Sequence, residues 1–141
     1  MSSIAVSPYL NFGGRAREAM EFYQKLFGGK LDLLAFTPDG APHPAGPDDA
    51  IMHAALTADG VTIMGADGMS DHPPTVGDNF AIALSGDDLE RLSKIFEGLS
   101  EGGRVKQTLK KESWGDTFGW LEDKFGVNWM VNISDPKVEV A

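Results

Sequence analysis

Hydrophobic and polar residues follow the same plan in two stretches of the chain. Residues 51–64 read IMHAALTADGVTIM, and residues 121–133 read LEDKFGVNWMVNI. In each stretch an apolar run leads into a short charged turn that closes on glycine, and an alternating strand follows. Glycine tolerates the positive φ that such turns need, so Asp59-Gly60 and Phe125-Gly126 predict two equivalent β-hairpins. We therefore interpret the chain as two copies of one unit.

The first half predicts a strand, a helix and three further strands. A helix is indicated by an apolar stripe at i, i+4, i+7 and i+11, formed by Ala16, Met20, Tyr23 and Phe27. The predicted elements are a strand over 4–12, a helix over 15–27 that ends at Gly28-Gly29, and strands over 31–36, 51–57 and 61–66. Four prolines between residues 37 and 49 predict a loop there.

The second half repeats this order. Asp87 is the predicted N-cap of a helix, with Glu90 in the capping-box position. Its apolar stripe is Leu89, Leu92, Phe96 and Leu99, and the predicted strands span 79–85, 105–111, 117–122 and 127–133. We therefore expect an α+β fold: a single domain over 1–141 made of two βαβββ modules, about 4–67 and 78–134, joined by a linker over 67–77.

Two such modules imply a site between their sheets. One face of each sheet is covered by its helix, so pairing the modules gives an eight-stranded incomplete barrel with a cleft. Clefts of this kind are common small-molecule sites. The alternation of side chains assigns Thr62, Met64 and Ala66 to the cleft in the first module, and Asn128, Met130 and Asn132 in the second.

Composition narrows the function classes. The chain has 12 Lys+Arg against 21 Asp+Glu, a net charge of −9 that repels nucleic acid and anionic membranes. It has no cysteine, which excludes disulfides, thiolate metal sites and cysteine nucleophiles. The N-terminus lacks the features of a signal peptide, and no stretch has the ~18 apolar residues of a membrane helix. We expect a cytoplasmic protein.

Three stretches carry a resemblance to a known superfamily. They are SPYLNFGGRAREAMEFYQKLFGG at 7–29, IMHAALTADGVTIMGAD at 51–67 and WGDTFGWLEDKFGVNWMVN at 114–132. With the order of elements between them, they resemble the vicinal-oxygen-chelate superfamily of glyoxalase I, extradiol dioxygenases and bleomycin-resistance proteins, and within it the PhnB-like branch. The resemblance implies the glyoxalase/bleomycin-resistance/dioxygenase fold and a homodimer.

Metal chemistry is placed in doubt by the same resemblance. Catalytic members hold a divalent metal with His, Gln or Glu from the first and last strands of each half. Those positions fall here on Ser7 (or Pro8), Met64, Ala81 and Met130, which are not imidazole or carboxylate ligands. We therefore expect no metal and no other cofactor. Some relatives carry a 3-demethylubiquinone methyltransferase label, but no Gly-rich loop of the kind that nucleotide-type cofactors need is present.

His53 is the candidate catalytic residue. It lies inside a predicted strand, where a polar side chain must find a partner. It is either a hydrogen-bonded structural histidine or a general base or ligand contact, since an imidazole titrates near neutral pH. His43 and His72 lie in loop segments and are expected to be solvated.

Aromatic and methionine side chains are the candidate ligand contacts. With the asparagines that supply polar contacts, the predicted ligand-binding residues are Tyr9, Asn11, His53, Met64, Trp114, Phe118, Trp120 and Met130. Met repacks readily around irregular ligands. Aromatics usually fill a core, and this is expected for at least one of the three at 114–120. Asparagines also cap turns.

The sequence favours a metal-free protein that binds a small, largely apolar organic molecule in the cleft. The alternative is an enzyme: a metal-dependent glyoxalase- or dioxygenase-type lyase or isomerase with non-standard ligands, or a metal-free enzyme that uses His53. A third possibility is an interaction protein whose own side chains fill the cleft.

Overall fold

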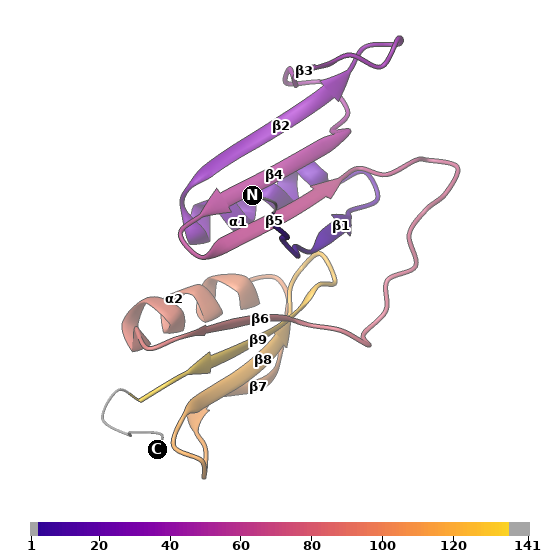
Figure 1. The fold of residues 1–141 in the computed structure, drawn as a ribbon. Helices are drawn as coiled ribbons and strands as arrows, with labels where there is room; N and C mark the ends of the chain where they lie inside the picture. The colour runs from indigo at the N-terminus through magenta and orange to yellow at the C-terminus, as the bar shows by residue number, and fades with distance from the viewer. Residues whose placement is uncertain (1–2, 136–141) are drawn as a thin grey trace. The chain divides into compact units, whose positions relative to one another are not determined.

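The computed structural model describes residues 3–135 of the 141-residue chain. The chain divides into two compact units, Met1–Thr75 and Val76–Ala141. Each unit contains one helix that lies on one face of an open β-sheet (Figure 1). The predicted α+β class is confirmed, and each unit holds the βαβββ order, with one additional strand in the N-terminal unit.

The N-terminal module has a five-stranded sheet in the order β1-β5-β4-β2-β3. Its elements are β1 (Tyr9–Asn11), α1 (Ala16–Phe27), β2 (Lys30–Phe36), β3 (Pro42–Pro44), β4 (His53–Ala58) and β5 (Val61–Ala66). β1 runs parallel to β5, and the other neighbours are antiparallel. α1 packs on β2, β4 and β5.

The C-terminal module repeats this arrangement in the order β6-β9-β8-β7. Its elements are β6 (Ile82–Gly86), α2 (Leu89–Ser100), β7 (Arg104–Lys111), β8 (Thr117–Glu122) and β9 (Asn128–Ile133). β6 is parallel to β9, as β1 is to β5. The second glycine after each helix also repeats a contact: a Cβ on Gly29 would meet the Thr57 carbonyl, and one on Gly103 would meet the Glu122 carbonyl. The internal repeat is therefore present in the close approaches of the backbone as well as in the strand order.

Each core lies between the helix and the covered face of its sheet. The predicted stripe of α1 is fully buried, from Ala16 to Phe27. In α2 the buried residues are Leu92, Ile95, Phe96 and Leu99, which are spaced i, i+3, i+4 and i+7. The predicted place of Leu89 in this stripe is wrong: Leu89 is the first residue of α2 and is 57% exposed.

The proline-rich segment contains a strand that the sequence analysis interpreted as loop. β3 pairs with β2 through Leu34–Pro44 and Phe36–Pro42. Proline is tolerated because β3 is an edge strand, where a missing N–H can face away from the ladder. The described residues 3–135 therefore hold nine strands, not the predicted eight. Before β3, the Thr37 hydroxyl donates to the Asp39 carboxylate and lowers the pKa of that carboxyl group.

Two predicted strands are shorter in the structure. β1 begins at Tyr9 instead of residue 4, because Pro8 has no N–H to give to a ladder. β6 begins at Ile82 instead of residue 79. Ile82, the first residue of β6, pairs with Trp129 on β9. The residues before β9, 123–127, form the hairpin turn that joins β8 to β9.

The start of α2 differs by one residue from the prediction. Asp88, not Asp87, is the N-cap, and its Oδ1 accepts a hydrogen bond of 3.0 Å from the Arg91 amide. An N-cap side chain bonds the amide three residues later, so Glu90 is not in the capping-box position. Glu90 instead pairs with Lys94 one turn along the helix, at 3.4 Å.

Candidate functional site

Tyr9 and His53 form a pair on the open face of the N-terminal sheet, the face opposite α1. The Tyr9 hydroxyl lies 3.1 Å from His53 Nδ1. The two rings stack with centroids 5.6 Å apart and planes 29° apart. The pair spans three strands, since β5 lies between β1 and β4. His53 thus has a side-chain partner that fixes the orientation of its ring, while none of residues 3–135 bonds its Nε2.

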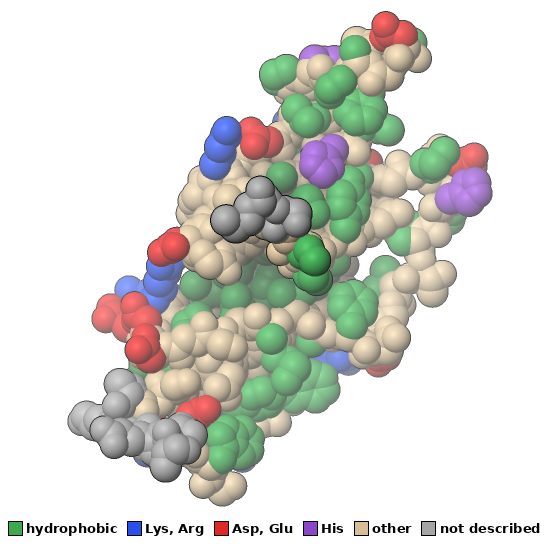
Figure 2. Space-filling view, in the orientation of Figure 1, with side chains coloured by type: hydrophobic (Ala, Val, Ile, Leu, Met, Phe, Trp, Pro, Cys, Tyr) green, Lys and Arg blue, Asp and Glu red, His purple; other side chains and the backbone are tan. Residues whose placement is uncertain are grey.

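Apolar side chains surround this pair on the same face. Met64, on β5, lies opposite Tyr9 of β1 and opposite Ala55 of β4. Leu34, on β2, lies opposite His53 of β4. Phe36, two residues further along β2, is exposed. Figure 2 shows hydrophobic side chains exposed over the strands of this module. Two polar groups on a largely apolar surface are typical of a small-molecule site.

Leu34 and Phe36 were not predicted as part of this surface. Both belong to one alternating run in β2, in which Asp32, Leu34 and Phe36 share a face by the pairing with β4 and β3. The period-2 pattern of that strand was the feature that pointed to them.

Asn11 shares the strand with Tyr9 but has a local role. Its Oδ1 accepts a hydrogen bond of 2.9 Å from the Gly13 amide. This is an Asx-type turn, in which a short side chain bonds the backbone two residues later. The turn-capping interpretation of asparagine therefore applies to Asn11.

The two glycines that precede α1 do not leave free amides for an anion. The Gly13 amide bonds Asn11, and the Gly14 amide bonds the carbonyl of Asp67 at 2.8 Å. The carboxylate of Asp67 accepts a hydrogen bond of 2.9 Å from the Ala16 amide and one of 2.7 Å from the Ile51 amide. A carboxylate of the chain itself thus occupies the N-terminus of this helix.

Three of the four site residues predicted in the C-terminal module share the open face of its sheet. Phe118 and Trp120 lie on β8, and Met130 lies opposite Trp120 on β9. Trp114 lies outside the strands, between β7 and β8, with its ring edge-on to Phe118 at 6.2 Å. The expectation that at least one of the three aromatics at 114–120 fills the core is wrong, because Trp114 and Trp120 are exposed and Phe118 is half-buried. Trp129 is the buried tryptophan.

The asparagines of β9 are engaged by side chains. Asn132 Nδ2 donates to Asp116 at 2.9 Å. Asn128 Oδ1 accepts from Lys106 Nζ at 2.9 Å. Both asparagines lie on the open face with Met130, as the alternation predicted, although Asn128 is buried.

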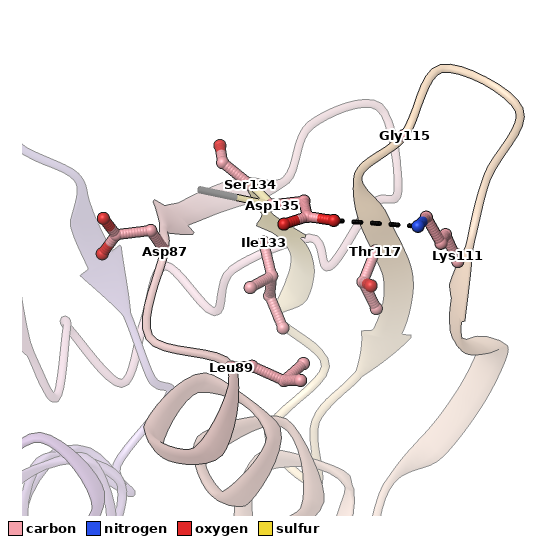
Figure 3. Close-up of a pocket in the computed structure, with 8 residues that line it drawn as sticks. All are labelled: Asp87, Leu89, Lys111, Gly115, Thr117, Ile133, Ser134 and Asp135. Atoms are coloured by element: carbon pink, nitrogen blue, oxygen red, sulfur yellow. Dashed lines mark ion pairs between the residues drawn. The ribbon is translucent and has the colours of Figure 1, made fainter. Parts of the chain in front are cut away.

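A separate pocket of about 450 Å³ lies at the end of the C-terminal sheet beside the start of α2 (Figure 3). Leu89 and Ile133 form its apolar part, and Lys111 pairs with Asp135 at 3.7 Å across one side. Asp87, the residue wrongly predicted as a cap, lines it too. The pocket contains none of the predicted site residues.

The positions carried over for a metal follow the strand register but carry no ligand groups. Met64 lies opposite Tyr9, and Met130 lies opposite Ala83. Ser7 and Ala81 come two residues before Tyr9 and Ala83, so the carried-over set is consistent between modules. Among residues 3–135, no three His, Asp or Glu side chains are grouped closely enough to hold a metal ion.

Comparison with known proteins shows the family. The model of the family described as 3-demethylubiquinone-9 3-methyltransferase matches residues 4–132. The chain belongs to this family, the PhnB-like branch of the vicinal-oxygen-chelate superfamily. It is 31% identical over 139 residues to Protein YjdN of Escherichia coli K12, covering 91% of this chain and 94% of YjdN.

Solved structures agree with this assignment. Protein PA1353 from Pseudomonas aeruginosa is 36% identical, with a TM-score of 0.79 over 94% of this chain and 99% of its own. A PhnB protein from Bacillus cereus is 26% identical, with a TM-score of 0.73 over 93% and 100%. The bleomycin resistance determinant of transposon Tn5 shares only the fold, at 15% identity and a TM-score of 0.54 over 94% and 98%.

Within the described residues, no helix is long and apolar enough to cross a membrane.

Proposed function

We propose that this PhnB-like chain binds a small, largely apolar organic molecule without a metal, and that the open face of the N-terminal sheet supplies the contacts. The observation that carries the proposal is the Tyr9–His53 pair, held at 3.1 Å beside the apolar side chains of Met64 and Leu34. Met64 and Leu34 offer apolar area beside it, and the Nε2 of His53, which bonds nothing within residues 3–135, offers one directed polar contact. The cleft between modules, the homodimer and the cytoplasmic location remain predictions.

A fluorescence titration with a neutral apolar probe, N-phenyl-1-naphthylamine, tests this proposal. Met64→Glu places a charge on the surface and is expected to abolish binding, whereas Met69→Glu, at an exposed methionine outside the strands, is the matched control. His53→Ala is expected to weaken binding at least severalfold, and His43→Ala, on β3, is expected to leave it unchanged. Equal affinities for wild type, Met64→Glu and His53→Ala would remove this face from the site.

A second candidate is a metal-free acid–base reaction, favoured by the same pair. A histidine oriented by a second side chain has the arrangement of a general base, with Tyr9 as the positioning residue and Nε2 directed at the substrate. The N-terminus of α1 does not favour a nucleotide-type phosphate, since the Asp67 carboxylate already accepts a hydrogen bond there. Metal analysis of the purified protein tests the metal-dependent alternative, because a stoichiometric metal would require ligands other than Met64 and Met130.

A further inference from the structure

We propose that the open face of the C-terminal sheet binds an organic carboxylate, with Lys106 and Asn128 holding the carboxylate and Trp120 contacting its apolar body. This inference goes beyond the proposed function: it uses residues of the other module and assigns a charge to the ligand. It stands on contacts within the C-terminal module alone.

Asn128 presents an unsatisfied donor. The side chain is 2% exposed, and its Nδ2 has no hydrogen-bond partner among the described residues. A buried amide N–H without an acceptor destabilises the fold, and a bound water or ligand that accepts from it removes that cost. The orientation of the amide is fixed, because Oδ1 must face the ammonium of Lys106, which only donates.

Lys106 lies beside that donor because of an irregularity in β7. The register between β7 and β8 shifts between Val105 and Gln107, and such a bulge re-aims the side chain at that position. The Lys106 ammonium is 2.9 Å from Asn128 Oδ1. The ammonium is therefore hydrogen-bonded to the same amide group that carries the unsatisfied N–H. Both groups only donate, so a ligand that satisfies both must bring acceptor oxygens, and the ammonium favours an anion.

Trp120 provides the apolar contact. The Lys106 ammonium lies 5.0 Å from the centre of a Trp120 ring, and Met130 lies opposite Trp120 on β9. These two side chains are 36% and 38% exposed, so the donor pair is bordered by an accessible apolar surface. An aromatic ring and a methionine suit a flat or irregular apolar body.

The carboxylates on the neighbouring strands and in the loop between them have partners other than Lys106. Glu122 lies opposite Asn128 in the register of β8 and β9, but its Oε2 is 3.7 Å from the Arg104 guanidinium. Asp116 is bonded to Asn132, and Glu112 accepts from Gln107 at 2.8 Å. Lys106 has no carboxylate within ion-pair distance in the described residues, which leaves its charge for an anion.

Calorimetric titration of the full-length protein with 2-naphthoate, and with the neutral 2-naphthylmethanol, tests the inference. We expect the carboxylate to bind more tightly than the alcohol. Lys106→Met should weaken naphthoate binding about tenfold or more, the loss of one charge-assisted hydrogen bond, and leave the alcohol unchanged. Lys94→Met removes the same charge from α2, on the other face of the sheet, and should have no effect on either ligand.

Asn128→Asp gives an independent check, since it preserves side-chain shape and the contact to Lys106 but replaces the free N–H with an oxygen. It should weaken naphthoate binding even where Lys106 is intact.

The inference is wrong if naphthoate and the alcohol bind equally, if neither binds, or if Lys106→Met and Lys94→Met give the same affinity for naphthoate. None of these outcomes bears on the neutral probe or on the variants at Met64 and His53, so the two proposals fail separately.

Discussion

Asp67, the residue that follows β5, accepts a hydrogen bond of 2.9 Å from the backbone amide of Ala16, the first residue of α1. Its other carboxylate oxygen accepts 2.7 Å from the Ile51 amide, just before β4. One side chain thus joins the starts of a helix and a strand that lie far apart in the sequence. It provides the N-cap that Arg15, the preceding residue, does not supply through its own side chain.

Asp67→Ala is therefore expected to lower the free energy of unfolding by about 1–3 kcal/mol, through the loss of a cap and of a second acceptor. Urea denaturation followed by tryptophan fluorescence measures this. Asp71→Ala removes an exposed carboxylate of the same linker and should change stability by less than about 0.5 kcal/mol. Equal stabilities of the two variants would show that the Asp67 bonds contribute nothing.

The glycine pair after α1 gives a comparison between neighbours. Both glycines have positive φ, but a Cβ on Gly29 would meet the Thr57 carbonyl and Ala58, whereas a Cβ on Gly28 would meet nothing within 4 Å. Gly29→Ala should therefore destabilise the protein by at least about 1 kcal/mol more than Gly28→Ala, whose cost is that of the backbone conformation alone. Thermal unfolding of the two variants decides this, and similar midpoints would count against the close approach.

The last hairpin depends on a buried carboxylate. Asp123 is 3% exposed. Its carboxylate accepts hydrogen bonds from the backbone amides of Phe125 and Val127 and one of 2.9 Å from the indole N–H of Trp129. Asp123→Asn sets an N–H₂ group against one of these donors and should cost about 1–3 kcal/mol. The near-ultraviolet circular dichroism of Trp129 should weaken in parallel. Glu97→Gln, on an exposed part of α2, is the isosteric control, and a stability equal to that of Asp123→Asn would contradict the assignment.

Elements with a periodic pattern were predictable because a buried face imposes its period on the sequence. α1 and β5 match within one residue, since Met20, Tyr23 and Ile63 all point to one core. The pattern could not show that Leu89 borders a pocket, nor that Pro42–Pro44 pairs at an edge, because both depend on what lies beside the element.

The placement of the candidate site residues was predictable in part for the same reason. Alternation placed Met64 and Met130 on open faces, and an isolated histidine in a strand identified His53. The partner of His53 is 44 residues away on β1, so the contact depends on strand order. The pairing of Lys106 with Asn128 depends on a bulge in β7 that no residue type announces.

The proposal that a ligand binds the open face of the N-terminal sheet is tested most directly by the methyl resonance of Met64. In protein labelled with ¹³C-methyl methionine, the Met64 and Met69 signals are assigned by substitution, and N-phenyl-1-naphthylamine is then added. We expect a saturable shift of the Met64 methyl signal that requires a severalfold higher probe concentration in His53→Ala, with the Met69 signal unchanged. A Met64 signal that stays in place while the probe is bound would contradict it.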